Sequence, residues 1–470
     1  MVLAKLENYI NGTFQAPSSQ NYIESYNPAI GKAFLGWSTT KRSLRSEIML
    51  KIAHLIEEKL EDFAVAESRD QGKPIKLARE VDIPRAVYNF KFFATYILHL
   101  ESKATEIDGI ATNYVQRTPV GVAALISPWN LPLYLLTWKI APAIAYGCTC
   151  VCKPSEFTSH TAYLLCKVMS QAGLPAGVVN MVFGNGVNAG EALVNHPNVD
   201  VVSFTGGTLT GSRIASNCAP KFKKVSLELG GKNANIIFAD CNFEEAVNTT
   251  VRSSFSNQGE ICLCGSRIFV EESIYEKFIE SFIEKTKKLK VGDPSDASTN
   301  LGAIVSKEHL EKIQFYVDLA KQEGGKIVHG GERITVSCKS FINGKETDET
   351  TNGWYFSPTI ITGLSPSHRV CQEEIFGPVV TVVPFKTEEE VLEYANGTEY
   401  GLSSSVWSEN GRKAKRIAEK LQVGTVWINC WMIRDLNMPF GGVKASGLGR
   451  EGSAYSLEFF SEEKTICMAN

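Results

Sequence analysis

The residue best suited to covalent chemistry is a cysteine that follows a glycine break. Cys262 lies in SNQGEICLCGSR (256–267), where Gly259 ends a helical pattern and a predicted strand follows. A thiol beside an exposed backbone N–H can act as a nucleophile, because the N–H can stabilise the charge that develops on the attacked group. Since most free cysteines are structural, burial of Cys262 and Cys264 at a strand edge is the alternative.

A carboxylate, Glu228, lies in the apolar strand of VSLELGGKN (225–233), just before a pair of glycines. A carboxylate inside an apolar strand is unfavourable unless it is paired or functional. An ion pair with Lys224 or Lys232 is one possibility. A general base is the other, because burial raises a carboxyl pKa toward neutrality. None of the seven histidines lies in these glycine-rich fragments, so the Cys-His dyad of a hydrolase is the poorer interpretation.

Three further fragments have the composition of a ligand site at strand ends. Asn130 in ISPWNLPLY could donate its amide to a developing oxyanion or simply form a turn. Lys153 and Glu156 in VCKPSEFT are either solvated charges or the partners of a nucleotide ribose. In the second case the charge of Glu156 would repel a 2′-phosphate, which favours NAD over NADP. SFTGGTLTG (203–211) is a glycine-rich strand-to-helix turn that suits a pyrophosphate, although it lacks the usual G-x-G-x-x-G spacing.

These fragments follow short apolar strands that alternate with helical patterns, which is typical of a parallel sheet covered on both faces. We therefore predict a doubly wound α/β unit over about 110–233, a helix over 41–66 before it, and a second open α/β domain that begins near 244. The turn-rich segment 337–353 is predicted to be a surface excursion. Short strands are predicted at 120–127, 149–153, 179–184, 199–206 and 234–238.

Composition excludes several classes of protein. The chain has 470 residues, 44% of them hydrophobic and 21% charged, as in a globular protein, and its net charge of −3 argues against a general nucleic-acid binder. No segment approaches the roughly 18 uninterrupted apolar residues of a membrane span. The N-terminus lacks a signal-peptide pattern, so we expect a cytoplasmic location and no membrane partner. Cys148, Cys150 and Cys152 share one face of a predicted strand, but without a nearby histidine core burial is favoured over a metal site.

Taken together, the fragments resemble one family. PWN, KPSE, FTGGT, LELGGK, NQGEIC, EEIFGPV and PFGGVKASGLGREG occur here in the order seen in the aldehyde dehydrogenase superfamily, over essentially the whole chain. The resemblance implies an α/β fold and a homodimer or homotetramer. The implied parts are a Rossmann-type NAD-binding domain (1–100 and 120–233), a second open α/β catalytic domain (234–433) and a small β oligomerisation arm (101–119 and 452–470).

The resemblance also implies roles for residues. Cys262 matches the nucleophile, Glu228 the general base, and Asn130 the oxyanion donor, together with the Cys262 backbone N–H. No metal is implied. Gly207 departs from the family pattern, since many relatives carry a serine after FTG. The residues that match the NAD site are Ile126, Ser127, Pro128, Trp129, Lys153, Ser155, Glu156, Phe204, Thr205, Gly206, Gly207, Gly211, Leu229, Glu374 and Phe376.

The implied reaction is the oxidation of an aldehyde to an acid. The Cys262 thiolate attacks the aldehyde carbon, Asn130 stabilises the alkoxide, a hydride passes to NAD, and Glu228 activates the water that hydrolyses the thioester. Relatives that transfer the acyl group to coenzyme A typically lack the glutamate of ELGGK, which this chain keeps. We therefore expect hydrolysis rather than transfer to a thiol.

Two arginines bear on the substrate. Arg85 in REVDIPRAVYNF and Arg434 in NCWMIRDLNMPFGG could be ordinary surface residues. Their contexts also resemble the branch of the superfamily that oxidises 2-aminomuconic semialdehyde, where the matching arginines bind the substrate carboxylate beside Asn130. A guanidinium suits a carboxylate because it makes two parallel charge-assisted hydrogen bonds. We therefore expect oxidation of 2-aminomuconate semialdehyde to 2-aminomuconate, in the kynurenine route of tryptophan breakdown.

Two alternatives stay open. Ile261 and Leu263 beside Cys262 would suit an apolar substrate, as in a retinaldehyde or broad-specificity aliphatic aldehyde dehydrogenase. The alternative of another class is a catalytically silent structural or binding protein, like the lens crystallins derived from this superfamily. The intact set of catalytic residues argues against a silent protein.

Overall fold

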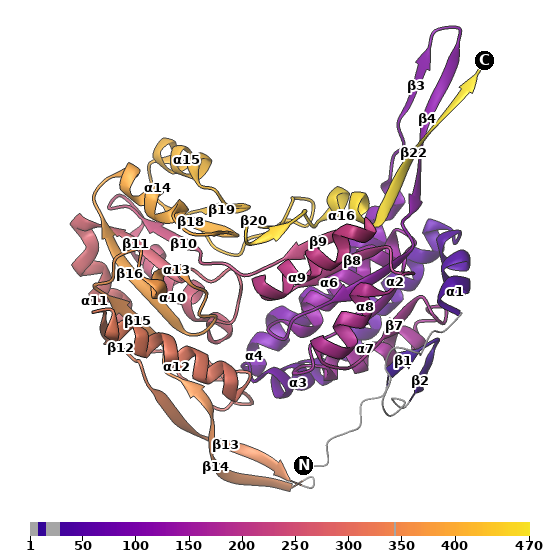
Figure 1. Cartoon of the computed structure of the whole chain (residues 1–470). Coiled ribbons are helices and arrows are strands. Elements are labelled where there is room, and N and C mark those ends of the chain that lie inside the picture. Colours follow the sequence, from indigo (N-terminus) through magenta and orange to yellow (C-terminus); the bar gives the residue numbers. More distant parts are fainter. Residues whose placement is uncertain (1–7, 16–28, 343–344) are drawn as a thin grey trace.

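The computed structural model describes residues 8–15, 29–342 and 345–470 (Figure 1). The first seven residues, on which the signal-peptide expectation partly depends, lie outside the described residues. Two α/β sheets form two lobes, a three-stranded sheet projects from one lobe, and a β-hairpin projects from the other. Within the described ranges, no helix has the length and apolar character needed to cross a membrane.

The sheet of the first lobe has eight strands, and its inner strands are parallel. In spatial order they are β2 (Thr13–Gln15), β1 (Asn8–Ile10), β7 (Val179–Met181), β6 (Thr149–Lys153), β5 (Val122–Ile126), β8 (Val201–Thr205), β9 (Lys224–Glu228) and β21 (Gly447–Leu448). Strands β5 to β9 pair in parallel, and antiparallel strands complete both edges. The predicted doubly wound unit is therefore confirmed.

Helices cover both faces of this sheet, and the alternation of side chains along β5 shows how. Ala123 and Leu125 pack with the N-terminal helices, α6 and α7, whereas Val122, Ala124 and Ile126 pack with α8 and α9. Such two-sided burial explains the nearly continuous apolar strands. The helices are α1 (Ala29–Ser38), α2 (Arg42–Glu58), α3 (Leu60–Gln71), α4 (Ile75–Leu77), α5 (Ile83–Tyr96), α6 (Pro132–Ala145), α7 (His160–Gln171), α8 (Glu191–Asn195) and α9 (Thr208–Cys218).

The single helix predicted over 41–66 is wrong in one respect. The segment forms two helices, α2 and α3, because Lys59 between them leaves the helical conformation, with φ −104° and ψ 22°. The cysteines Cys148, Cys150 and Cys152 are fully buried in the core, as the sequence predicts. Within the part of the chain that the structure describes, no cluster of metal-ligating side chains occurs.

The second lobe is built on a seven-stranded sheet in which only β12 is antiparallel to its neighbour. In spatial order the strands are β12 (Lys326–His329), β15 (Thr359–Thr362), β16 (Val379–Phe385), β11 (Arg267–Glu271), β10 (Ala234–Ile237), β18 (Ser403–Trp407) and β19 (Thr425–Ile428). Its helices are α10 (Phe243–Phe255), α11 (Tyr275–Thr286), α12 (Lys307–Gln322), α13 (Arg369–Gln372), α14 (Glu388–Asn396) and α15 (Gly411–Lys420). The predicted second open α/β unit is found, but it begins at Ala234 and not near 244, because β10 pairs with β11 and β18 of this sheet.

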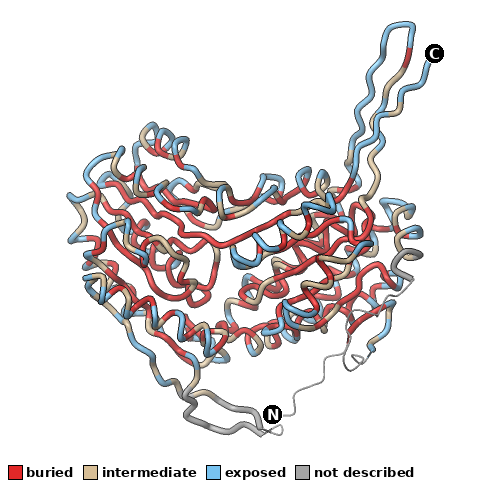
Figure 2. The backbone as a smooth tube through the Cα atoms, viewed as in Figure 1, coloured by how far each residue is buried: buried red, intermediate tan, exposed pale blue. Residues whose placement is uncertain are grey.

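Two β structures project from the lobes. The arm consists of β22 (Ser461–Ala469), β4 (Ala111–Pro119) and β3 (Ala104–Ile107), and Figure 2 shows that most of it is exposed. Helix α16 (Ser453–Phe460) precedes the arm and packs on the first lobe through Phe460. The described part of the predicted excursion 337–353 lies in the paired strands β13 (Arg333–Ile342) and β14 (Lys345–Phe356), and residues 343–344 lie outside the described residues.

A buried group of charges holds the end of α3 against the loop that precedes α6. The ammonium of Lys73 contacts the carboxylate of Asp82 and lies 3.9 Å from that of Glu67, and all three side chains are inaccessible to solvent. Lys73 also donates a hydrogen bond of 3.0 Å to the Asn130 carbonyl oxygen. Burial raises the pKa of both carboxyl groups, and the charge of Lys73 opposes that rise.

We expect Lys73→Met to lower the free energy of unfolding by about 3–5 kcal/mol at pH 7.5, because it leaves two buried carboxylates without their cation. The raised pKa values mean that the folded variant takes up protons as the pH falls, so the deficit should be smaller at pH 5.5. Denaturant unfolding at both pH values measures this, and Lys73→Met combined with Asp82→Asn should recover part of the loss. An equal deficit at both pH values would mean that lost packing, not charge, is the cause.

Candidate active site

The loop that carries Cys262 follows α10 and has an unusual backbone. Asn257, Gln258 and Gly259 have φ values of 52°, 55° and 73° in succession. Left-handed conformations are costly for residues with a side chain and persist only where the surroundings fix them. A Cβ on Gly259 would overlap the Gly377 carbonyl oxygen, so a glycine is required there. The turn therefore fixes where the following cysteine lies.

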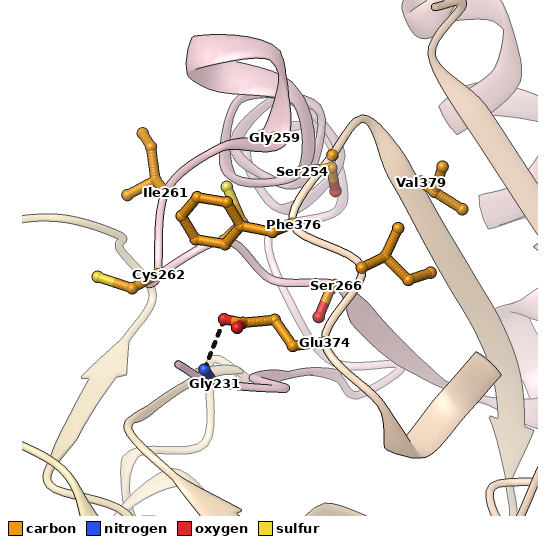
Figure 3. A pocket seen from close by; sticks show the side chains of 12 residues that line it. Gly231, Ser254, Gly259, Ile261, Cys262, Ser266, Glu374, Phe376 and Val379 are labelled. Carbon is orange, nitrogen blue, oxygen red and sulfur yellow. Dashed lines mark hydrogen bonds between the residues drawn. The ribbon is translucent and has the colours of Figure 1, made fainter. Parts of the chain in front are cut away.

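Cys262 is half-buried on the wall of a pocket that Glu374 and Phe376 also line (Figure 3). Burial raises the pKa of its thiol to about 12; the charges of Glu228 and Glu374 contribute to the rise, and that of Arg434 opposes it. The thiol rather than the expected thiolate is therefore the resting form at neutral pH. Cys264 is only 6% exposed and packs in an apolar cluster, so Cys262 is the more accessible of the two.

Asn130 reaches from the first lobe to the cysteine loop. Its side-chain amide donates a hydrogen bond of 2.8 Å to the carbonyl oxygen of Glu260, two residues before Cys262. The backbone carbonyl oxygen of Asn130 accepts hydrogen bonds from Lys73 at 3.0 Å and from the Asn257 side chain at 3.1 Å. An amide nitrogen carries two hydrogens, so one is left for a ligand. The Cys262 backbone N–H has no acceptor among the described residues, so both predicted oxyanion donors retain a hydrogen to donate.

Glu228 ends β9 with its side chain buried. Among the residues that the structure describes, neither carboxylate oxygen has a hydrogen-bond partner. The ion pair considered from sequence is not found: Lys224 pairs instead with Glu462 at 2.6 Å, and no described contact joins Glu228 to Lys232. Burial, and then the charge of Glu451, raises the pKa of Glu228 well above its ordinary value. A buried carboxyl group without a partner is costly, which favours a functional role.

Most of the residues predicted to bind a nucleotide gather at the C-terminal ends of the parallel strands of the first sheet. The register of the parallel strands sets Ile126 beside Lys153 on one side and Phe204 on the other. Ligands of α/β proteins bind at such a point, where the strand order reverses. Lys153 is buried and pairs with Glu156 at 2.9 Å, so it is not a solvated charge. The other predicted residues at these strand ends are Ser127, Pro128 and Trp129 after β5, Ser155 after β6, and Thr205 at the end of β8.

The turn between β8 and α9 fits a phosphate group. A Cβ on Gly206 would overlap the Phe204 ring, and one on Gly211 would overlap the Leu229 side chain, so a larger residue at either position would have to displace that side chain. No described side chain caps the N-terminus of α9, which leaves backbone N–H groups open to an anion. A Cβ on Gly207 would meet nothing within 4 Å. The missing serine therefore removes a hydroxyl without changing the backbone cradle.

Glu374 and Phe376 come from the second lobe and line the cysteine pocket (Figure 3). The Gly231 backbone N–H donates to a carboxylate oxygen of Glu374 at 2.8 Å. Phe376 has a φ of 62°, and its ring packs edge-on against Trp129 with centroids 5.4 Å apart. This ring contact brings the end of β5 in the first lobe to the pocket of the second.

Arg85 and Arg434 meet at one aromatic surface and are half-buried rather than freely exposed. Their guanidinium carbons lie 5.9 Å and 5.7 Å from the centroid of the Trp138 ring. Burial lowers the pKa of Arg85, and the positive charge of Arg434 lowers it further. In the described part of the chain, Arg85 Nε and Nη2 are buried without an acceptor. Two neighbouring cations with unused hydrogen-bond donors favour the binding of an anion.

Several residues around the site have no role assigned from the sequence. Lys139 pairs with Glu451 at 3.1 Å, and the charge of Glu451 acts on Glu228. A lysine inside the apolar segment TWKIAPAI was a signal that could have indicated this pair. Glu260 is fully buried, and His309 lies 3.9 Å from it while its Nε2 lies 2.6 Å from the Phe376 carbonyl oxygen. Nothing in the sequence pattern indicated either contact.

Comparison with known proteins agrees with this geometry. A model of the aldehyde dehydrogenase family matches residues 10–466. The 2-aminomuconic semialdehyde dehydrogenase of Homo sapiens is 51% identical, covering 99% of this chain and 98% of that protein. The enzyme of the same name from Bos taurus is 50% identical, with the same coverage. The 2-hydroxymuconic semialdehyde dehydrogenase of Pseudomonas sp. is 41% identical over 99% of this chain and 100% of that protein.

Solved structures are similar along the whole chain. An indole-3-acetaldehyde dehydrogenase from P. syringae, determined with NAD+, has a TM-score of 0.92 and 34% identity, covering 99% of this chain and 97% of its own. A betaine aldehyde dehydrogenase from Staphylococcus aureus, also determined with NAD+, has a TM-score of 0.91 and 37% identity, covering 99% of this chain and 95% of its own. The chain belongs to the aldehyde dehydrogenase family.

Proposed function

We propose that this chain oxidises an aldehyde to a carboxylic acid, with NAD as hydride acceptor, through a covalent adduct on Cys262. The observation that carries the proposal is a reachable thiol whose pKa responds to the charge of Glu228, a buried carboxyl group without a partner among the described residues. Family membership and the solved relatives with NAD+ support it. Catalytically inert family members would have no need of an unpartnered buried carboxylate.

The first half of the reaction uses the two loops that meet at the pocket. The Cys262 thiol gives its proton to solvent water as its sulfur attacks the aldehyde carbon, and the carbonyl oxygen becomes an alkoxide. The free amide hydrogen of Asn130 and the Cys262 N–H donate to that oxygen. One such donor contributes about 3 kcal/mol to the transition state. NAD, when bound at the C-terminal strand ends of the first sheet, supplies the acceptor for the hydride that the alkoxide expels.

The second half uses Glu228. Once the hydride has left, an acyl thioester remains on Cys262. Ionised Glu228 takes a proton from water, the water oxygen attacks the thioester carbon, and the thiol leaves as the acid forms. A carboxyl pKa that burial raises suits this role, because the group accepts a proton more readily than an ordinary carboxylate.

We further propose that the aldehyde carries a carboxylate, with 2-aminomuconate semialdehyde as the substrate. The paired guanidinium groups of Arg85 and Arg434 on Trp138 favour an anionic substrate, as do the names of the similar semialdehyde dehydrogenases. This substrate corresponds to the kynurenine route of tryptophan breakdown expected from the sequence. An apolar aldehyde would leave the buried donors of Arg85 without an acceptor.

We propose that the first lobe is the NAD-binding domain, the second the catalytic domain, and the arm an oligomerisation element of a homodimer or homotetramer. The arm is a short sheet with two open edges, and exposed strand edges favour pairing with another chain. It also exposes large apolar side chains, at Ile107, Ile110, Tyr114 and Met468. The cytoplasmic location expected from the sequence stays a prediction.

We expect Glu228→Gln to separate the two halves of the reaction. The variant should form one equivalent of NADH per active site and then stop at the thioester, because no base activates water. Stopped-flow absorbance measures the burst, and mass spectrometry of the quenched protein measures the acyl group. Cys262→Ser, the matched control, should give neither burst nor adduct. Loss of the burst in Glu228→Gln as well would show that Glu228 acts before hydride transfer or only holds structure.

We expect Arg434→Ala to discriminate between substrates. The KM for 2-hydroxymuconate semialdehyde should rise about 10- to 100-fold, because the variant loses a charge-assisted hydrogen bond to the carboxylate. The KM for an uncharged aldehyde such as hexanal should change little. Steady-state NADH formation with both substrates measures the difference. Equal losses on both would refute carboxylate recognition and would revive a broad-specificity aldehyde dehydrogenase.

A further inference from the structure

The proposed carboxylate site includes a buried polar side chain that neither the motifs nor the predicted roles cover. Tyr134 lies on α6 one turn before Trp138, and only 5% of it is exposed. Arg434 Nη1 donates a hydrogen bond of 3.4 Å to the Tyr134 hydroxyl oxygen. The guanidinium carbon of Arg85 lies 5.2 Å from the centroid of the same tyrosine ring. One side chain therefore contacts both cations.

Hydrogen-bond donors without a described acceptor lie around Tyr134 on two helices, α5 and α6. Because its oxygen accepts from Arg434, the Tyr134 hydroxyl keeps its own hydrogen to donate. No described residue is seen to accept that hydrogen, and Arg85 on α5 likewise keeps two buried N–H donors without an acceptor. A carboxylate has about four lone-pair positions and can accept from several such donors together. A neutral hydrocarbon chain can accept from none.

The ring of Tyr134 also bears on the spacing of the two cations. Arg85 and Arg434 repel each other, and each contacts both Tyr134 and Trp138. Aromatic faces attract guanidinium groups, so this pair of rings, one helical turn apart on α6, can hold both cations in place before an anion binds. Pre-positioned donors bind an anion more tightly than donors that must first be ordered.

We propose that Tyr134 is a positioning and specificity residue for the carboxylate of the substrate. Its ring positions Arg85, and its hydroxyl positions Arg434 and donates a hydrogen bond to the carboxylate. This inference rests on the proposed function, because it assumes that a carboxylate lies between the two arginines. Tyr134 acts on binding of acidic aldehydes and takes no part in the chemistry at Cys262.

The first test is Tyr134→Phe, which keeps the ring and removes the hydroxyl. The KM for 2-hydroxymuconate semialdehyde should rise about tenfold, as expected for a hydrogen bond to a charged group. Its kcat and the KM for hexanal should stay within about twofold of wild type. Tyr88→Phe is the matched control, since the exposed Tyr88 ring lies 5.7 Å from the Arg85 guanidinium carbon and has no described contact with Arg434. Equal effects of Tyr134→Phe on both substrates would overturn the inference.

The second test measures binding without turnover. Adipate, a six-carbon dicarboxylate, is titrated into the wild type, Tyr134→Phe, Tyr134→Leu and Arg434→Ala by calorimetry, with melting temperatures recorded to confirm folding. The affinity should fall about tenfold for Tyr134→Phe and further for Tyr134→Leu, which also loses the ring against Arg85. If Arg434→Ala weakens adipate and Tyr134→Phe does not, only the role of Tyr134 fails. If Arg434→Ala binds adipate as the wild type does, the proposed carboxylate site fails with it.

Discussion

The hydrogen bond of 2.8 Å between the Asn130 side chain and the Glu260 carbonyl oxygen joins the two lobes where the chemistry is proposed. Asn130 belongs to the loop after β5, and Glu260 to the turn that precedes Cys262. Lys73 and the Asn257 side chain donate hydrogen bonds to the backbone carbonyl oxygen of Asn130. The relative position of sulfur and oxyanion donors therefore depends on contacts between elements far apart in the chain, not on either loop alone.

Some buried charged groups are compensated by a partner of opposite charge, and others are not. Lys73 is compensated by Glu67 and Asp82, and Lys139 by Glu451, so these groups stabilise the framework around the site. Glu228 has no such partner within the described residues, and the donors of Arg85 have no acceptor. The charge of Arg434 acts on both Glu228 and Cys262, so the proposed carboxylate site lies near the reactive sulfur. A carboxylate on the substrate would give the buried donors of Arg85 an acceptor.

Much of the fold could be predicted because its signals are local. Apolar runs predict β5, β6 and β8, and the glycines at 206 and 211 lie where a Cβ would collide with a neighbour. The individual motifs also predict which residues reach the strand ends, and their order along the chain points to the family. Sequence periodicity could not show the helix break at Lys59, where the apolar spacing continues through a non-helical residue.

The contacts that assemble the site were harder to predict, because each joins segments that are distant in sequence. In the sequence, Tyr134 is one residue of a predicted apolar helix. The two arginines reach it because α5 and the loop after β19 pack against α6. The same holds for Glu260, whose carbonyl oxygen accepts from a different lobe.

The left-handed turn before Cys262 bears on how this protein can be redesigned. The carbonyl oxygen of Gly377 occupies the space that any side chain at Gly259 would need, so this glycine leaves no room for variation. Libraries that aim to change substrate scope are better directed to the wall formed by α5 and α6. There, the side-chain hydrogen bonds of Tyr134 and Trp138 go to Arg434 and Glu451, not to the turn that carries Cys262.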